Sequence, residues 1–294
     1  MWRKATIADA GGWEADTLTE DLDLSYRAQL KGWKFQYLEN KVSPAELPAE
    51  MNAIKSQQFR WSKGAAECVR KNLRMVMQEK SVKWSTKVHA FFHLMNSFNY
   101  ISLLLSGILL IPLMYMFSDL EEAGVLLGFM SIYQVSFFLL YAFYVTANAQ
   151  VSLKSVQDYL KFSLHYPFFL SVSMGISLYN AIGVIEGYLG KKSDFIRTPK
   201  FNIVRKNGSW DGKDYVKREV TLVTWLEFAC FLLFSFGLGS AIYLNNVGAI
   251  PYFMMMTCGF GAVLYYSYWH FEKAKSLQQE PLEGEVEMKQ VIDI

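Results

Sequence analysis

Apolar residues gather in long runs in the C-terminal two thirds of the chain, whereas polar residues dominate the first 97 positions. A helix needs about 20 mainly apolar residues to cross the hydrocarbon core of a bilayer. Four runs meet this requirement, at residues 98–117, 125–147, 222–244 and 249–269. A fifth apolar run, 162–189, is interrupted by Pro167, Asn180, Glu186 and several glycines. The pattern therefore predicts an α-helical polytopic membrane protein with four transmembrane helices and one irregular apolar segment.

The charges between these runs indicate on which side of the membrane each connecting segment lies. The linkers 118–124 and 245–251 contain no Lys or Arg, whereas basic residues are frequent at 55–87, 154–161 and 191–218. Because basic loops stay on the cytosolic side, we expect the basic segments inside and the two short linkers outside. A full crossing by 162–189 would carry 191–218 outside. We therefore predict that 162–189 is an interfacial or re-entrant element, or a hairpin, that returns to the cytosolic side.

The polar segment before the first apolar run predicts a helix, a strand and a loop. Leu22, Tyr26 and Leu30 recur at helical spacing after Thr19, and Gly32 ends that helix. Residues 33–38 alternate as in a strand, and 41–48 form a loop. This pattern is typical of the edge of a soluble α/β domain, which in full needs several strands and about 100–150 residues.

Two further helices are expected ahead of the first apolar run. Residues 49–80 form a basic helical stretch, and residues 82–93 are amphipathic and rich in aromatic side chains. An amphipathic helix of this kind lies in the membrane interface. A solvated helix packed on its own domain has the same pattern, so both interpretations stay open.

Composition agrees with the membrane class. Of the 294 residues, 52% are hydrophobic, 16% aromatic and only 19% charged, which excludes an ordinary soluble domain. The net charge of +2 comes with no compact basic motif of a nucleic-acid reader, so no nucleic-acid partner is expected. The charged residues of 280–293 are mostly acidic, and this stretch predicts a solvated acidic tail. Cys68, Cys230 and Cys258 are widely spaced, which argues against a disulfide framework and against a zinc site.

The stretch from Thr19 to Asp23 places three carboxylates within four residues, at Glu20, Asp21 and Asp23. One interpretation is structural: Thr19 caps a helix whose dipole stabilises acidic residues in its first turn. The other is catalytic, with a carboxylate that takes a proton from a sugar hydroxyl as a general base. The Asp-x-Asp spacing also has the form of a metal site, but such near positions on a helix do not converge on one ion.

The stretch from Gln57 to Trp61 combines side chains suited to a sugar nucleotide. Arg60 offers a rigid fork for phosphate oxygens, and Trp61 offers a flat apolar face and an N–H donor for a sugar ring. Gln57 and Gln58 supply amide groups for hydroxyls. An interfacial Arg-Trp pair that anchors a helix at a membrane explains the same residues equally well.

Together, the two stretches resemble the C-terminal half of the catalytic domain of membrane-embedded family 2 glycosyltransferases, the cellulose synthase superfamily. Members carry Thr-Glu-Asp, later Gln-x-x-Arg-Trp, and then transmembrane helices. The chain is most similar to the mannan-synthase-like and xyloglucan-backbone-synthase-like branches. The similarity covers about residues 2–75 closely, and the membrane part in layout. It rests on Glu20-Asp21-Leu22-Asp23-Leu24, Leu30-Lys31-Gly32-Trp33-Lys34-Phe35, Glu46-Leu47-Pro48 and Gln57-Gln58-Phe59-Arg60-Trp61.

The resemblance implies a role for each motif. Asp21, with Thr19 and Glu20 as motif neighbours, corresponds to the catalytic base that activates the acceptor hydroxyl for inverting transfer. A second set corresponds to the signature that holds the nucleotide diphosphate and the acceptor end of the glycan: Gln57, Gln58, Arg60 and Trp61.

A third stretch, 195–200, is similar to the family's gating loop, Phe-x-Val-Thr-x-Lys, which covers the bound nucleotide. Phe195, Thr198 and Lys200 match this pattern, whereas Arg197 stands in place of the Val. A polybasic juxtamembrane loop attracted to anionic lipid is the alternative interpretation. In the family this loop lies on the cytosolic side, which agrees with the placement of residues 191–218 inferred from charge.

The resemblance also implies how the chain is organised. We expect a C-terminal part of a GT-A type α/β catalytic domain at 1–80 and an interfacial helix at 81–97. Two transmembrane helices at 98–147 and two at 219–270 enclose a cytosolic or interfacial region at 148–218, and an acidic tail occupies 271–294. The family's nucleotide-binding half, with its site for a divalent cation (Mg or Mn), is expected ahead of Trp2. We therefore expect a C-terminal fragment that transfers no sugar alone.

The function expected from these features is an inverting, processive β-glycan synthase in a multi-pass membrane protein with its catalytic side in the cytosol. It would use a nucleotide sugar, UDP-glucose or GDP-mannose, and pass the growing glycan through the membrane. Two alternatives remain: a non-processive membrane glycosyltransferase that acts on a lipid acceptor, and a non-catalytic membrane channel subunit.

Three other polar positions carry weaker expectations. His89 and His93 lie four residues apart on one helical face, but no carboxylate or third ligand completes a zinc site. Glu227 lies near the cytosolic end of an expected span. It either pairs within the bundle or contacts glycan.

Overall fold

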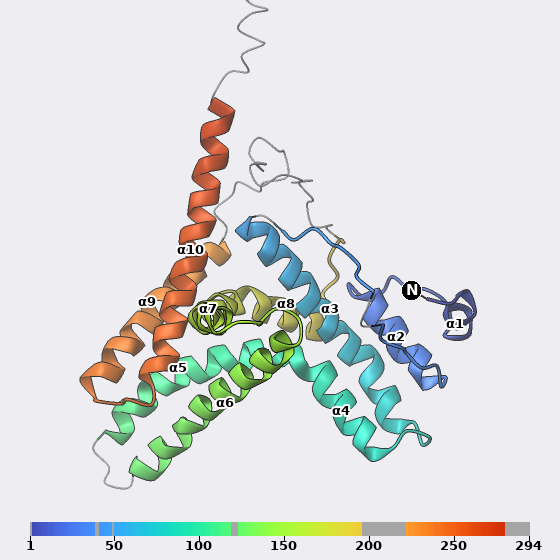
Figure 1. Ribbon diagram of the computed structural model, residues 1–294, viewed down its shortest axis with the longest axis horizontal. Coiled ribbons are helices and arrows are strands. Elements are labelled where there is room, and N and C mark those ends of the chain that lie inside the picture. The colour runs from blue at the N-terminus through green and yellow to red at the C-terminus, as the bar shows by residue number, and fades with distance from the viewer. Residues whose placement is uncertain (1, 39–40, 49, 119–122, 196–221, 280–294) are drawn as a thin grey trace, which may run out of the picture.

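The computed structural model describes residues 2–38, 41–48, 50–118, 123–195 and 222–279, which are mostly helical. A small N-terminal unit of α1 (Lys4–Asp9) and α2 (Glu20–Leu30) lies at one end of the molecule in Figure 1, and a bundle of apolar helices lies at the other. The long helix α3 (Met51–Gln78) joins the two parts. It is followed by α4 (Trp84–Leu94), the short 3-10 helix η1 (Met95–Phe98), α5 (Asn99–Phe117), α6 (Ala123–Ala149), α7 (Val156–Gly175), α8 (Ser177–Leu189), α9 (Leu222–Tyr243) and α10 (Ile250–Gln279).

Helix α2 confirms the helix expected after Thr19, and Gly32 ends it as expected. Gly32 has a φ of +87°, a conformation that glycine adopts without a steric penalty. The strand expected at 33–38 is wrong, because this segment is irregular and the described residues contain no strand. A strand needs a neighbour to receive its backbone hydrogen bonds, and the described part of the chain supplies none. An α/β character for this region therefore stays a prediction.

Helix α3 confirms the basic helix expected at 49–80, but it is far from a uniformly solvated helix. Glu50 begins it, with a side-chain carboxylate that accepts a 2.9 Å hydrogen bond from the N–H of Asn52. Lys55 and Lys63 are buried on the side that faces the apolar helices, together with Ala66, whereas Gly64 is buried against Thr19 of the N-terminal unit. Helix α3 is thus an internal element that contacts both parts of the molecule.

Two helical segments, Trp84–Phe117 and Leu222–Tyr243, are long and apolar enough to cross a membrane, and the bent pair formed by α7 and α8 makes a third if it is one span. Helices α6 and α10 coincide with the other two expected spans. The total of four spans stays a prediction. The bundle has a common core centred on Phe234, Phe253 and Phe260, which are fully buried between α5, α9 and α10.

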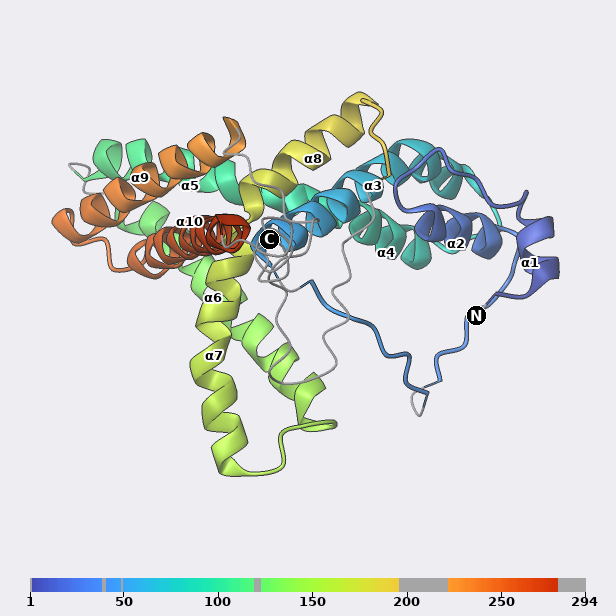
Figure 2. The ribbon, with the colours of Figure 1, turned by 90° about the horizontal axis from the view of Figure 1, so that it is seen from above.

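The irregular apolar run expected at 162–189 forms two helices, α7 and α8, which meet at an angle of 44°. Helix α7 is seen end-on in Figure 1 and lengthwise in Figure 2, where it runs away from α9 and α10. It therefore crosses α10, which it contacts, instead of extending the bundle. Gly175 and Gly259 allow the crossing, because a Cβ atom at either glycine would overlap the backbone of the opposite helix. This arrangement agrees with a broken span or a re-entrant element.

Helix α8 packs along α3, as both views show (Figures 1 and 2). Gly183 and Gly187 lie four residues apart on the face of α8 that meets α3, the spacing that lets two helices approach closely. A Cβ at Gly187 would lie 2.6 Å from the carbonyl oxygen of Lys63 and 2.7 Å from the Cβ of Ala66. The glycines that interrupt the apolar run are therefore packing positions against α3.

Replacing Gly187 with alanine is expected to destabilise the α3–α8 contact, because overpacking a close interface costs about 1–3 kcal/mol. Gly239→Ala on α9 is the matched control, since a Cβ there meets nothing within 4 Å. Alanine also favours a helix over glycine by about 1 kcal/mol. The unfolding temperature of the purified protein in detergent should fall for Gly187→Ala and hold or rise for Gly239→Ala. Equal temperatures for the two variants would contradict the close approach.

Candidate functional site

The acidic stretch begins α2 where this helix contacts α3. The helix starts at Glu20, with Glu20, Asp21 and Asp23 in its first turn, as the structural interpretation expects. The hydroxyl of Thr19 does not cap the helix, because it lies 3.4 Å from the Sγ of Cys68 on α3 instead. Its side chain also packs on Gly64, where a Cβ would lie 2.6 Å from the Thr19 methyl carbon. Thr19 therefore docks the start of α2 on α3.

Asp21 and Asp23 have opposite environments although they are two residues apart. Asp21 is exposed, and its Oδ1 accepts a 2.8 Å hydrogen bond from the N–H of Leu22. Asp23 is fully buried, at 0% exposure. Its Oδ2 accepts bonds from Arg27 Nε at 2.9 Å and from Lys71 Nζ at 3.1 Å, and its Oδ1 accepts a bond from Asn72 Nδ2 at 2.9 Å. Asp21 alone of the two is placed to meet a substrate, and Asp23 holds the helix in place.

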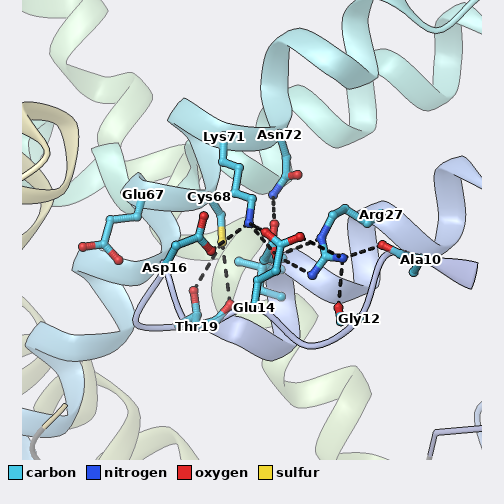
Figure 3. A network of polar contacts seen from close by, with 12 residues as sticks. Ala10, Gly12, Glu14, Asp16, Thr19, Arg27, Glu67, Cys68, Lys71 and Asn72 are labelled. Atoms are coloured by element: carbon cyan, nitrogen blue, oxygen red, sulfur yellow. Dashed lines mark hydrogen bonds and ion pairs between the residues drawn. The ribbon is translucent and has the colours of Figure 1, made fainter. Parts of the chain in front are cut away.

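Lys71 is the centre of the network in Figure 3. Its ammonium group donates to Glu14 at 2.5 Å, to Asp16 at 2.7 Å and to Asp23. Arg27 completes the network by donating to the carbonyl oxygens of Ala10 and Gly12. The network therefore holds α2, and the segment 10–16 that precedes it, against α3.

The same contacts set the charges of the network. Burial alone would raise the pKa of Asp23, but the hydrogen bonds from Arg27, Asn72 and Lys71 outweigh it and hold that pKa below its usual range. Burial would lower the pKa of Lys71, yet its three carboxylate partners raise it. Both groups are therefore fully charged at neutral pH.

Glu14, Asp16 and Asp23 bring three carboxylates within 4.8 Å of one another, the arrangement in which a cation is held. The Lys71 ammonium already lies among them and bonds all three. A divalent cation would have to displace the Lys71 ammonium group, so these three carboxylates do not fit a metal ion. The Asp-x-Asp pair does not converge either, because Asp21 faces solvent and Asp23 faces α3.

The second motif, Gln57 to Trp61, lies in the N-terminal half of α3. Gln57, Gln58 and Arg60 are half-buried, and Trp61 is 49% exposed, so its ring face is available to a ligand. The Cζ of Arg60 lies 4.6 Å from the ring centroid of Phe195, within the range of a cation–π contact. The structure therefore brings the start of the gating-like loop onto the second motif. Thr198 and Lys200 of that loop lie outside the described residues.

All three motifs meet at residues 60–64 of α3. Thr19 packs on Gly64, which lies one turn after Arg60, and Phe195 stacks on Arg60 itself. Lys63 also donates to the hydroxyl of Ser193, just before Phe195. Segments far apart in the sequence thus contact neighbouring turns of α3. Asp21 is exposed in the first turn of α2, two residues after Thr19, and Arg60 and Trp61 lie on α3.

Apart from Glu227, the charged groups that hold these segments together were not expected from the sequence. Asp23 and Arg27 could have been found, because oppositely charged residues four apart on a helix pair with each other. Lys71 could not, since its partners lie 48 to 57 residues away. The partners in the pairs Lys55–Glu227 and Lys63–Glu186 are even farther apart in sequence, by 172 and 123 residues.

His93 forms a contact between two helices. Its Nδ1 lies 2.7 Å from the hydroxyl of Tyr26, which joins α4 to α2. Burial raises the pKa of Tyr26 to about 12, so this hydroxyl stays protonated. A groove of about 960 Å³ between α2 and α4 is lined by Tyr26, His89 and His93 among others, and none of the expected site residues lines it.

Comparison with known proteins adds a family to this geometry. A family model described as Glycosyl transferase family group 2 matches residues 1–153. The chain is 42% identical over 93 residues to glucomannan 4-beta-mannosyltransferase 1 of Oryza sativa subsp. japonica, which is 32% of this chain and 18% of that protein. It is 42% identical over 92 residues to glucomannan 4-beta-mannosyltransferase 2 of Arabidopsis thaliana, which is 31% of this chain and 17% of that protein. The match thus spans less than a fifth of these relatives. No solved structure matches.

Proposed function

This chain belongs to glycosyl transferase family group 2, and from that premise we propose that it forms the acceptor side of a membrane-embedded β-glycan synthase. The observation that carries the proposal is the meeting of three segments on α3. Thr19 packs on Gly64, Arg60 contacts Phe195, and Asp21 is exposed at the start of α2. Trp61 is exposed on the same stretch of α3.

In the proposed reaction, Asp21 acts as the general base. Its carboxylate accepts the proton of the acceptor hydroxyl, and the hydroxyl oxygen forms a bond to the anomeric carbon of the donor sugar. The bond from that carbon to the diphosphate breaks, and its electron pair leaves with the nucleotide diphosphate. Attack from the side opposite the leaving group inverts the anomeric configuration. Asp21 suits this role because it is exposed, whereas Asp23 is enclosed by cations.

The remaining motif residues would bind the two substrates. The Arg60 guanidinium, held by the Phe195 ring, would neutralise diphosphate oxygens. Trp61 would stack on a sugar ring of the acceptor, and Gln57 and Gln58 would bond its hydroxyls. Thr198 and Lys200 would complete the nucleotide side.

Family 2 glycosyltransferases generally use a divalent cation, which supplies positive charge to the leaving diphosphate. The carboxylates of Glu14, Asp16 and Asp23 do not fit such an ion, because the Lys71 ammonium group already forms ion pairs with all three. No step that we assign to this chain passes through the cation.

The apolar helices would place this site at the membrane. Two segments long and apolar enough to cross a bilayer agree with a membrane protein. We propose four spans with the basic segments, and therefore the site, on the cytosolic side. The growing glycan would leave between the helices.

The test is glycan synthesis by membranes of cells that express the complete reading frame containing this chain. Labelled GDP-mannose and labelled UDP-glucose are supplied separately, because the relatives named above are mannosyltransferases and the donor is open. We expect a long insoluble polymer from one donor, cleaved by a β-mannanase or a β-glucanase. A lipid-soluble glycolipid would indicate transfer to a lipid acceptor. Incorporation from neither donor would favour a non-catalytic channel subunit.

A further inference from the structure

Two buried lysines lie on the face of α3 that meets the apolar bundle. Lys55 is 6% exposed and Lys63 is 0% exposed. Lys55 Nζ lies 2.7 Å from Oε2 of Glu227 on α9, and Lys63 Nζ lies 3.0 Å from Oε2 of Glu186 on α8. The two ion pairs therefore flank the Gln57–Trp61 motif along the same helix.

Between Lys55 and Lys63 along the helix, Phe59 packs the same face of α3 against α8. The ring of Phe59 lies 5.2 Å from the ring of Tyr179, and Phe59 also packs on Gly183. Lys55 precedes Gln57 by two residues, so the ion pair to α9 and the motif share adjoining turns of one rigid helix. Any rotation or sliding of α3 against α9 would move Arg60 and Trp61.

Stability alone does not account for the Lys55–Glu227 pair. Glu227 is fully buried, and its second oxygen, Oε1, has no hydrogen-bond partner among the described residues. An apolar pair of similar volume is often as stable as a buried ion pair, or more stable. An unsatisfied buried oxygen adds a further cost. What the ion pair supplies, and apolar packing does not, is one defined register between the two helices.

We infer that Lys55 and Glu227 form a positioning pair for the acceptor site. The Glu227 carboxylate on α9 fixes how α3 is rotated about its axis and how far it is shifted along that axis. This position sets where Arg60 and Trp61 meet the end of a β-1,4-linked glycan. Neither charged group contacts the glycan. The inference rests on the proposed function, because it assigns the pair to that same site.

The test compares stability with glycan affinity in the full chain, purified in detergent. The probe is fluorescently labelled β-1,4-mannohexaose or, if UDP-glucose proves to be the donor, the matching β-1,4-glucohexaose, and fluorescence anisotropy gives its dissociation constant. The variants are Lys55→Met, Glu227→Gln and the two combined. Lys191→Gln is the control, since Lys191 is an exposed lysine that pairs with Glu186 of the same bundle.

Each single variant leaves an unpaired polar or charged group and should lower the unfolding temperature. The double variant removes both charges and should recover that temperature, yet bind the probe at least about tenfold more weakly, because small misplacements of binding groups are costly. The control should bind as the wild type does. A double variant with wild-type affinity, or affinities that follow the unfolding temperature across the set, would overturn the inference. A wild-type chain that does not bind the probe would instead overturn the acceptor site itself, and the inference with it.

Discussion

In the complete reading frame that contains this chain, the Asp21→Asn variant is expected to lose almost all glycan synthesis while it keeps its fold and its affinity for the nucleotide donor. Loss of a general base costs about a hundred- to ten-thousandfold in rate. Asparagine has nearly the same shape, and its side-chain oxygen can still accept the hydrogen bond that Asp21 receives from the N–H of Leu22. The rate is measured as polymer formed in membranes, and donor affinity as binding of the labelled nucleotide sugar.

Glu79→Gln is the matched control for Asp21→Asn. The Glu79 carboxylate also accepts a backbone hydrogen bond, from Ser81 at 2.9 Å, but it lies at the far end of α3. This variant should synthesise glycan at the wild-type rate. Near-normal synthesis by Asp21→Asn would remove Asp21 from the role of base. Equal loss in both variants would indicate a general effect of surface charge.

The Asp23→Asn variant is expected to lose far more stability than Asp21→Asn, although the two substitutions are chemically the same. Asp23 is fully buried and its carboxylate bonds Arg27, Lys71 and Asn72. Removing one partner of a buried ion pair costs about 3–5 kcal/mol, because the remaining charges lose their counter-ion. Hydrogen exchange should therefore speed up in α1 and α2, which the network ties to α3. Asp21→Asn serves as its control, since an exposed substitution changes stability by only about 0.5 kcal/mol.

Acid should reproduce the effect of Asp23→Asn in the wild-type protein. The pKa of Asp23 is lower in the folded protein than its unfolded value of about 3.9. Its contribution to stability is therefore complete above that value and is lost as the pH falls through the folded pKa. Lys71 has a raised pKa, so its contribution is complete below about 10.4 and is lost only as the pH rises through its own folded pKa.

Tryptophan fluorescence follows this acid transition, because Trp2 and Trp33 pack in the small core of α1 and α2. The signal should stay constant from neutral pH down to about 4 and change below it. In Asp23→Asn the signal should already be altered at neutral pH. An acid transition of the same size in both proteins would show that another group causes it.

Much of the helical layout could be predicted from the sequence, because local patterns determine it. The spacing of Leu22, Tyr26 and Leu30, with Gly32 behind them, marks α2 within a residue or two. The long apolar runs mark α5 and α9, since helices of that composition are stable only when lipid or other helices surround them. The motifs at Asp21 and at Gln57–Trp61 are likewise local, and they carried the family resemblance.

The strand expected at 33–38 shows where local patterns fail. Alternation of apolar and polar residues favours a strand only where a second strand can pair with it, and the described chain offers no partner. The glycines of the irregular run are a similar case. As a pattern they interrupt a span, and in the fold Gly183 and Gly187 are the surface on which α3 rests.

The sequence by itself determined the helices, the chemistry of the three motifs and the family to which they point. It could not decide which acid of Asp21-Leu22-Asp23 is exposed, because both positions are equally polar in the pattern. Only the tertiary structure decides this, through Lys71 and Asn72, which lie 48 and 49 residues away from Asp23. It likewise joins Lys55 to Glu227, 172 residues apart. A backbone repeat fixes which residues share a helix face, whereas the partner of a buried charge depends on how distant helices pack.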